Sequence, residues 1–234
     1  MNLESFDWNK NYNEFIKYLF SLQDIKYRDF HFKLLKDDNI KLIGIKTPVL
    51  KKIASSISKC DYISFINNNK HEYYEETLLH GIVIANTKDI SLLDDFLKYI
   101  DNWAINDIVA TSMKYFKYNQ SDGLILIQNY IKNKNPWIMR FGYVLLLSFY
   151  VNDLYIDKVI GLIKLVNNDS YYVKMSIAWL ISICFIKYKD KTIKLFENNN
   201  LDKFIINKAI SKINDSFRVS KLDKEEIKKY KVKE

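Results

Sequence analysis

The chain has 234 residues, of which 48% are hydrophobic and 27% charged, and this balance excludes a disordered protein. Only 5 Gly and 2 Pro are present, which disfavours β-sandwiches and β-barrels because those folds need many tight turns. The net charge of +8 favours a polyanionic partner, with nucleic acid ahead of an anionic membrane.

Two features predict a cytoplasmic protein without a membrane span. The segment from Met1 to Trp8 is polar and acidic, unlike a signal peptide. The longest apolar runs, Tyr143–Val151 and Ile177–Ile186, are too short to cross a bilayer.

Neither a metal nor a cofactor is expected. The chain has two cysteines, of which Cys184 lies in an apolar run and is predicted to be a buried thiol. The three histidines (His31, His71 and His80) have no metal-ligand spacing. The sequence contains no phosphate-cradling Gly-rich loop and no nucleophile elbow.

Helical spacing of apolar residues runs through the whole chain, and short linkers rich in Asn, Asp and Lys separate the segments. The predicted helices are Asn9–Leu22, Ile25–Leu35, Pro48–Ser58, Tyr62–Asn67, Glu72–Ala85, Leu92–Tyr99, Trp103–Phe116, Ser121–Lys132, Pro136–Phe149, Tyr155–Val166, Tyr171–Tyr188, Lys191–Asn198, Asp202–Asn214 and Lys221–Lys229. Thr47 and Asn135 each precede a proline and are predicted to cap the helix that follows. The pattern therefore predicts an all-α protein.

From residue 47 the helices come in pairs that recur at intervals of roughly 35 to 40 residues, a period typical of helical repeats. Stacked pairs form a solenoid with a concave inner surface. We therefore expect a single domain over residues 1–234. It comprises N-terminal helices (1–46), stacked helix pairs (47–220) and a C-terminal capping helix with its tail (221–234).

Trp103 and Asp107 stand out in the predicted helix from Trp103 to Phe116. Both fall on the face opposite the apolar seam, and their spacing of four makes them neighbours. Core packing does not call for a Trp beside an Asp. The alternative is a Trp covered by the next repeat beside an ordinary surface carboxylate.

Arg140 is the only charge on an otherwise apolar helix, one turn from Trp137. A buried arginine must be paired or must face an anionic ligand, so a salt bridge and a phosphate contact are both open. Trp179 lies within an apolar run, where a plain core residue is the alternative to a functional aromatic. Further candidate contacts to DNA are Trp137, Lys46, Thr47, Lys174, Lys208, Lys212, Ser216 and Arg218.

From about Tyr27 to Tyr230 the chain resembles the AlkD-like DNA alkylation repair family, which is built from HEAT-like repeats. The resemblance rests on Leu42-Ile43-Gly44-Ile45-Lys46-Thr47-Pro48, Trp103-Ala104-Ile105-Asn106-Asp107, Trp137-Ile138-Met139-Arg140, Ile177-Ala178-Trp179 and the run from Lys208 to Ser220. No one of these motifs is decisive, but their order and separation are specific.

The resemblance implies a monofunctional DNA glycosylase that removes cationic alkylated purines such as 3-methyladenine and 7-methylguanine. It would act on double-stranded DNA as a monomer and without a cofactor. Asp107 matches the catalytic carboxylate, and Trp103 and Trp179 match the flanking aromatics. Arg140 matches an arginine near the DNA backbone at the lesion.

One departure keeps an alternative open. The resemblance leads us to expect a charged pair just after Trp179, but the chain has Ser182 and Ile183 there. Related subfamilies that lack parts of the active site bind branched or distorted DNA without releasing bases. A third possibility is a helical scaffold that binds a peptide, which the basic charge disfavours.

Overall fold

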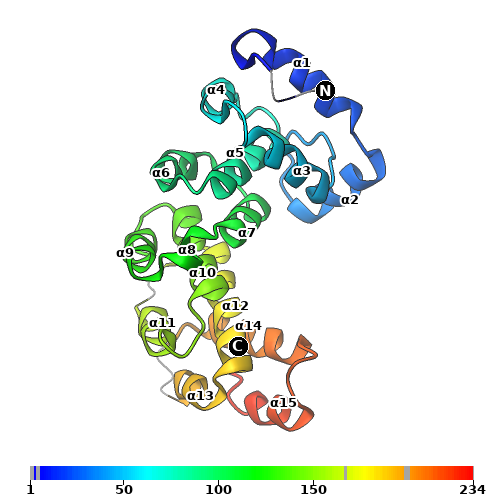
Figure 1. Ribbon diagram of the computed structural model, residues 1–234. Coiled ribbons are helices and arrows are strands. Elements are labelled where there is room, and N and C mark those ends of the chain that lie inside the picture. Colours follow the sequence, from blue (N-terminus) through cyan, green and yellow to red (C-terminus); the bar gives the residue numbers. More distant parts are fainter. Residues whose placement is uncertain (1–2, 4–5, 166–167, 198–200, 234) are drawn as a thin grey trace. The chain divides into compact units, whose positions relative to one another are not determined.

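A computed structural model describes residues 3, 6–165, 168–197 and 201–233. These residues form fifteen α-helices and two short 3₁₀ turns, with no strand in the described part of the chain. The predicted all-α fold is therefore confirmed. The chain divides into two compact units, Met1–Tyr115 and Phe116–Glu234 (Figure 1). This boundary lies inside the predicted stack of helix pairs, and the single-domain organisation stays a prediction.

The helices of the first unit are α1 (Trp8–Ser21), α2 (Ile25–Leu35), α3 (Thr47–Ile57), α4 (Tyr62–Asn68), α5 (Tyr74–Thr87), α6 (Leu93–Phe96) and α7 (Trp103–Ser112). The short helix α8 (Tyr115–Tyr118) spans the boundary between the units. The second unit contains α9 (Gln120–Tyr130), α10 (Pro136–Phe149), α11 (Ile156–Lys164), α12 (Tyr171–Lys187), α13 (Lys189–Glu197), α14 (Lys203–Asp215) and α15 (Lys221–Lys228).

Each unit is built from helices that pack in rows. In the first unit α5 packs between α3 and α7, and α6 packs against α5. In the second unit α12 packs between α10 and α14, while α9 and α13 cover α10 and α12. Alternate helices along the chain thus form one row in each unit, α3, α5 and α7 in the first and α10, α12 and α14 in the second, and we call these six the row helices. This arrangement is that of a helical repeat protein, as predicted.

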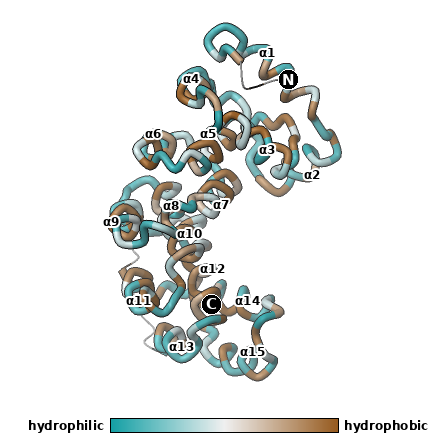
Figure 2. Tube along the Cα trace, viewed as in Figure 1, coloured by the Kyte–Doolittle hydropathy of each residue, from teal (hydrophilic) through white to brown (hydrophobic). Residues whose placement is uncertain are grey.

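Four of the row helices, α5, α7, α10 and α12, are more apolar than the other long helices. Figure 2 shows α10 and α12 mainly in brown, whereas α13 carries much more teal. Buried residues occupy most of α5 and run through α10 and α12. Helices buried on several sides lose the one-sided pattern of a surface helix, because neighbours cover more than one face.

The predicted repeat interval is mostly too long. Row helices begin at Thr47, Tyr74, Trp103, Pro136, Tyr171 and Lys203, so only the interval from Pro136 to Tyr171 reaches 35 residues. In the first unit this follows from the shortness of the covering helices. Helix α4 has 7 residues, and α6 has 4 residues between two 3₁₀ turns, so less chain is needed before the next row helix.

The two helix starts with proline differ from each other. The side chain of Asn135 accepts a hydrogen bond from the Trp137 N–H at 2.8 Å, as predicted for a capping residue. Thr47 is not a cap: it is the first helical residue of α3, and Lys46 precedes it without a capping side-chain bond. Proline at the second helical position still suits this start, since its missing N–H would have no partner inside the helix.

Helix α7 is shorter than predicted and ends at Ser112, so Phe116 belongs to α8. Near this end, the hydroxyls of Thr111 and Ser112 donate to the backbone oxygens of Asp107 and Ile108, both at 2.7 Å. Such bonds from a hydroxyl to a carbonyl one turn earlier compete with the N–H bonds of the helix, and they weaken helical structure locally. The other predicted helices are confirmed to within two residues. The exceptions are Leu92–Tyr99, which combines α6 with 3₁₀ turns, and the predicted ends at Val166 and Asn198, which lie outside the described residues.

A buried carboxylate holds the irregular segment before α3 in the first unit. Glu75 of α5 is fully buried and accepts hydrogen bonds from the N–H groups of Ile43, Gly44 and Ile45 at 2.9, 2.7 and 3.1 Å. Gly44 has a φ of 99°, and a Cβ there would lie 2.4 Å from the Cβ of Arg28. Only glycine fits this position, and the segment leads directly into Lys46 and α3.

Candidate functional site

Two of the predicted catalytic residues, Trp103 and Asp107, lie one turn apart at the start of α7. Asn102 caps this helix, and its side-chain oxygen accepts hydrogen bonds from the N–H groups of Ala104 and Ile105 at 3.1 and 3.0 Å. Asn102 is itself 4% exposed, so the cap is anchored in the protein. The local fold thereby sets the direction in which Trp103 and Asp107 leave the helix.

The exposure of these two side chains matches the predicted pattern. Ile105 and Val109 are buried, whereas Trp103 and Asp107 are each only half-buried. Trp103 therefore keeps part of its surface accessible, and Asp107 is within reach of a ligand. A partly desolvated carboxylate beside an aromatic ring suits the stabilisation of a positive charge.

Arg140 and Trp137 meet the first turn of α12 in the second unit. Arg140 is 5% exposed, and its Nη1 donates a hydrogen bond to the backbone oxygen of Tyr172 at 2.6 Å. The Trp137 and Tyr172 rings lie 4.8 Å apart between centroids. The predicted neighbours Trp137 and Arg140 thus share Tyr172 as a contact.

Trp179 is not a fully buried core residue. Its side chain is half-buried, and the Nζ of Lys212 on α14 lies 5.9 Å from the centre of its ring. This is the geometry of a cation–π contact. At the departure after Trp179, the buried hydroxyl of Ser182 donates to the backbone oxygen of Trp179 at 2.7 Å.

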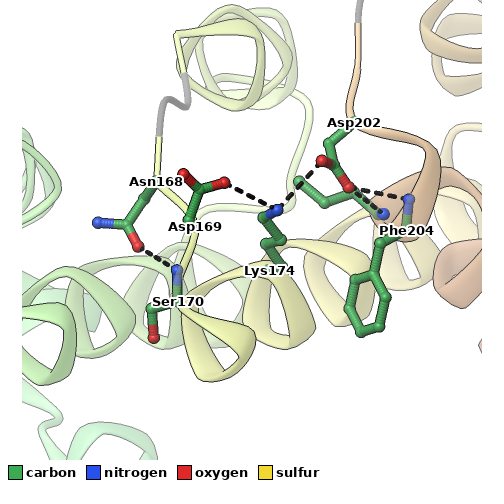
Figure 3. Close-up of polar contacts among 7 residues, drawn as sticks. Asn168, Asp169, Ser170, Lys174, Asp202 and Phe204 are labelled. Atoms are coloured by element: carbon green, nitrogen blue, oxygen red, sulfur yellow. Dashed lines mark hydrogen bonds and ion pairs between the residues drawn. The ribbon is translucent and has the colours of Figure 1, made fainter.

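Lys174 is engaged with two carboxylates. Its Nζ lies 3.2 Å from Asp169 and 3.1 Å from Asp202, and its side chain is 16% exposed (Figure 3). Asp202 also caps α14 by accepting from the Phe204 N–H at 2.8 Å. Hydrogen bonds to Asp202 and Asp169 raise the pKa of Lys174, so it stays charged. Its charge links α12 to α14, and a phosphate would have to compete with both carboxylates.

Lys46 and Thr47 lie at the start of α3 in the first unit. The Nζ of Lys46 is 2.9 Å from a carboxylate oxygen of Asp24, and this contact raises the pKa of Lys46. The Lys46 side chain remains 58% exposed, so it is accessible to an anion. Thr47 is half-buried at the first helical position.

The remaining predicted DNA contacts lie on α14 and in the loop that follows it. Lys208 is exposed, with its Nζ 5.6 Å from the Phe204 ring centre. In the loop, the Arg218 N–H donates to the Ser216 hydroxyl at 3.2 Å. The Arg218 side chain is exposed, as a phosphate contact requires.

Within the units, the structure brings together only some of the predicted site residues. Trp103 and Asp107 are neighbours in the first unit, while Trp137, Arg140 and Trp179 belong to α10 and α12 of the second. The sequence prediction missed Tyr171 and Phe204, whose rings continue from Tyr172. Their common signal is an aromatic residue within the first two positions of a row helix.

No three His, Cys, Asp or Glu side chains among the described residues lie close enough together to hold a metal ion. No helix in the described ranges is both long and apolar enough to cross a bilayer.

Comparison with known proteins identifies the family. The family described as DNA alkylation repair enzyme matches residues 15–213, which is most of the chain. No curated protein matches it. The match covers α7, α10, α12 and nearly all of α14, the helices that carry most of the candidate residues. The chain therefore belongs to the family of DNA alkylation repair enzymes.

Proposed function

We propose that this protein is a DNA glycosylase that hydrolyses the N-glycosidic bond of cationic alkylated purines, such as 3-methyladenine and 7-methylguanine. The observation that carries the proposal is the pair on α7, in which Asp107 and Trp103 lie one turn apart and half-buried beside a buried helix face. The family match supports a repair enzyme with DNA as its partner.

The charge of the lesion explains why one carboxylate suffices. Ordinary glycosidases use two carboxyl groups, because a poor leaving group must be protonated. A purine methylated at N3 or N7 already carries a positive charge and departs as a neutral base, taking the electron pair of the bond to the sugar. Water then attacks the sugar carbon and releases a proton, which leaves an abasic site.

Asp107 and the tryptophans would act on the charge that develops on the sugar. The carboxylate stabilises the oxocarbenium-like transition state and orients the attacking water. Each tryptophan face favours a cation by about 0.5–2 kcal/mol, so Trp103 and Trp179 would add modestly to the stabilisation of the transition state. These contributions are small, and we expect activity on labile cationic lesions and none on normal bases.

Positive side chains would hold the DNA backbone. We propose this role for the exposed side chains of Lys46, Lys208 and Arg218, with Trp137, Thr47 and Ser216 beside them. Arg140 and Lys174 would join them only by leaving the Tyr172 oxygen and the carboxylates of Asp169 and Asp202, respectively. Binding through phosphates makes affinity fall steeply as salt is raised.

Release of free base from DNA that contains 7-methylguanine tests the proposal directly. We expect release by the wild type and a roughly hundredfold slower rate for Asp107→Asn, equivalent to about 3 kcal/mol. Asp95→Asn is the matched control, because Asp95 is an exposed aspartate of the same unit that pairs only locally with Lys98. Tight, salt-sensitive DNA binding without base release in the wild type would overturn the proposed glycosylase activity. It would favour the alternative, a protein that binds branched or distorted DNA.

A further inference from the structure

Four aromatic rings join the first turns of three row helices in the second unit. They are Trp137 of α10, Tyr171 and Tyr172 of α12, and Phe204 of α14. The ring centroids are 4.8 Å apart from Trp137 to Tyr172, 5.3 Å from Tyr172 to Tyr171 and 5.6 Å from Tyr171 to Phe204. We call this series the aromatic ladder.

The aromatic ladder lies outside the hydrophobic core. Along each of its helices the first buried residue follows the ladder ring: Met139 in α10, Val173 in α12 and Ile205 in α14. Tyr171 is 55% exposed, and the other three rings are half-buried. Because core packing uses different residues, the ladder is not needed to fill the interior of the unit.

Cations accompany the rings. Lys203 and Lys208 are exposed on the first two turns of α14, and the Nζ of Lys208 lies 5.6 Å from the Phe204 ring centre. The buried Arg140 donates a hydrogen bond to the backbone oxygen of Tyr172, a residue of the ladder. The nearby carboxylates of Asp169 and Asp202 are held by Lys174 (Figure 3), which reduces their repulsion of an anion.

An exposed ring, Tyr171, beside partly exposed rings and positive charge has the features of a platform for single-stranded nucleic acid. In a paired duplex both faces of each base are covered by its neighbours. An aromatic side chain can therefore stack only on a base that has lost its neighbour, as in a single strand, a bulge or a flipped nucleotide. Because the chain belongs to a family of DNA repair enzymes, we take the partner to be DNA with unpaired bases.

We propose that the aromatic ladder binds unpaired nucleotides of DNA by stacking. The proposal rests on DNA as the partner in the proposed function, but it does not require Asp107 to be catalytic. Its role would be to hold bases displaced from a damaged or distorted duplex, and it makes the protein prefer DNA with unpaired nucleotides to a perfect duplex.

The test compares three fluorescein-labelled DNAs by fluorescence anisotropy: a short oligothymidine strand, a perfect duplex, and the same duplex with an unpaired bulge. Tyr171→Ala should bind the strand and the bulge roughly tenfold more weakly, as expected from about 1–3 kcal/mol per stacked base. Its affinity for the perfect duplex should change less than about twofold, because paired bases offer no free face.

Matched variants separate stacking from packing. Tyr171→Phe should bind like the wild type, since it keeps the ring, whereas Tyr171→Leu keeps apolar volume against Phe204 and should still lose affinity. Tyr118→Ala is the control on the same unit: Tyr118 is 67% exposed and has a lysine Nζ 5.7 Å from its ring centre, but it lies outside the ladder. It should leave all three affinities unchanged.

Several results would overturn the proposal. These are equal losses for the strand and the perfect duplex, no loss for Tyr171→Leu, or tighter binding of an oligouridine strand than of oligothymidine. Base release from methylated duplex, measured on the same Tyr171→Ala protein, keeps the two proposals apart. If the wild type releases no base but the ladder variants still lose affinity for unpaired DNA, only the glycosylase proposal fails.

Discussion

Helices α5 and α12 hold the same place in their two units, between two row helices, yet they are stabilised by different chemistry. Helix α5 buries Glu75, Glu76 and His80 in its first two turns. The buried residues of α12 are apolar except for two serines, and Ser176 donates to a backbone oxygen of its own helix at 2.7 Å. Among the described residues, the buried carboxyl groups thus lie in the first unit, whereas the second unit buries the charge of Arg140.

The neighbours of each helix explain the difference. Helix α5 packs beside the irregular segment at Ile43–Ile45, whose N–H groups have no helical partners and need an acceptor. The helices beside α12 satisfy their own backbone, so apolar packing is enough. A buried carboxylate is costly, and it is found where it replaces hydrogen bonds that the backbone cannot make for itself.

Of the substitutions that test this difference between α5 and α12, removal of the Glu75 carboxylate should have the largest effect on stability. Glu75→Ala would leave three buried N–H groups without acceptors, and we expect a loss of about 3–5 kcal/mol in the free energy of unfolding. Ser176→Ala in α12 should cost less than about 1 kcal/mol, because the helix keeps its backbone bonds. Urea unfolding followed by circular dichroism measures both, and similar losses would show that the two helices do not differ in this way.

Acid should weaken the first unit selectively. All three histidines lie there, and burial lowers the pKa of His71 to about 4 and that of His80 to about 3. The unfolded chain takes up protons near pH 6.5 while the folded unit does not, so stability is full above pH 6.5 and falls as the pH drops toward 4. Each histidine contributes up to about 1.4 kcal/mol per pH unit.

Hydrogen exchange, corrected to free energies of opening at neutral pH and at pH 5.5, should show this loss in α5 before α12. The Nδ1 of His80 lies 3.2 Å from the Nε2 of His71, whose ring stacks on Tyr99. His71→Asn suits the positive φ of 53° at this position and should reduce the pH dependence. An equal weakening of both units in acid would contradict the assignment to the histidines.

Surface ion pairs of the second unit should matter least. Lys191 and Asp157 lie 2.7 Å apart, but their side chains are 45% and 78% exposed. Asp157→Ala should change the free energy of unfolding by less than about 1 kcal/mol, since water and salt screen exposed pairs. Thermal melting at low and high salt checks this, and a loss comparable to that of Glu75→Ala would mean that the second unit depends on its charges after all.

Local patterns were sufficient for much of the fold and for part of the site. Ile25–Leu35 and Pro136–Phe149 were predicted to the residue, because apolar spacing and the Asn135-Pro136 start act within a few turns. The spacing of four residues likewise predicted that Trp103 and Asp107 lie one turn apart on the same face of one helix. The break after Ser112 was not predicted, because the seam continues in sequence through Phe116 although the helix does not.

The amino-acid sequence by itself determined the all-α class, the family resemblance and the α7 pair, since each depends on residues close together along one helix. Only the tertiary structure decided what surrounds Arg140, Trp179 and Lys174, and that Tyr171 and Phe204 extend the ring series. Those contacts join residues about thirty positions apart, on helices that are neighbours because alternate helices share a row. Periodicity identifies the buried face of a helix, but the partner on that face depends on how the whole row packs.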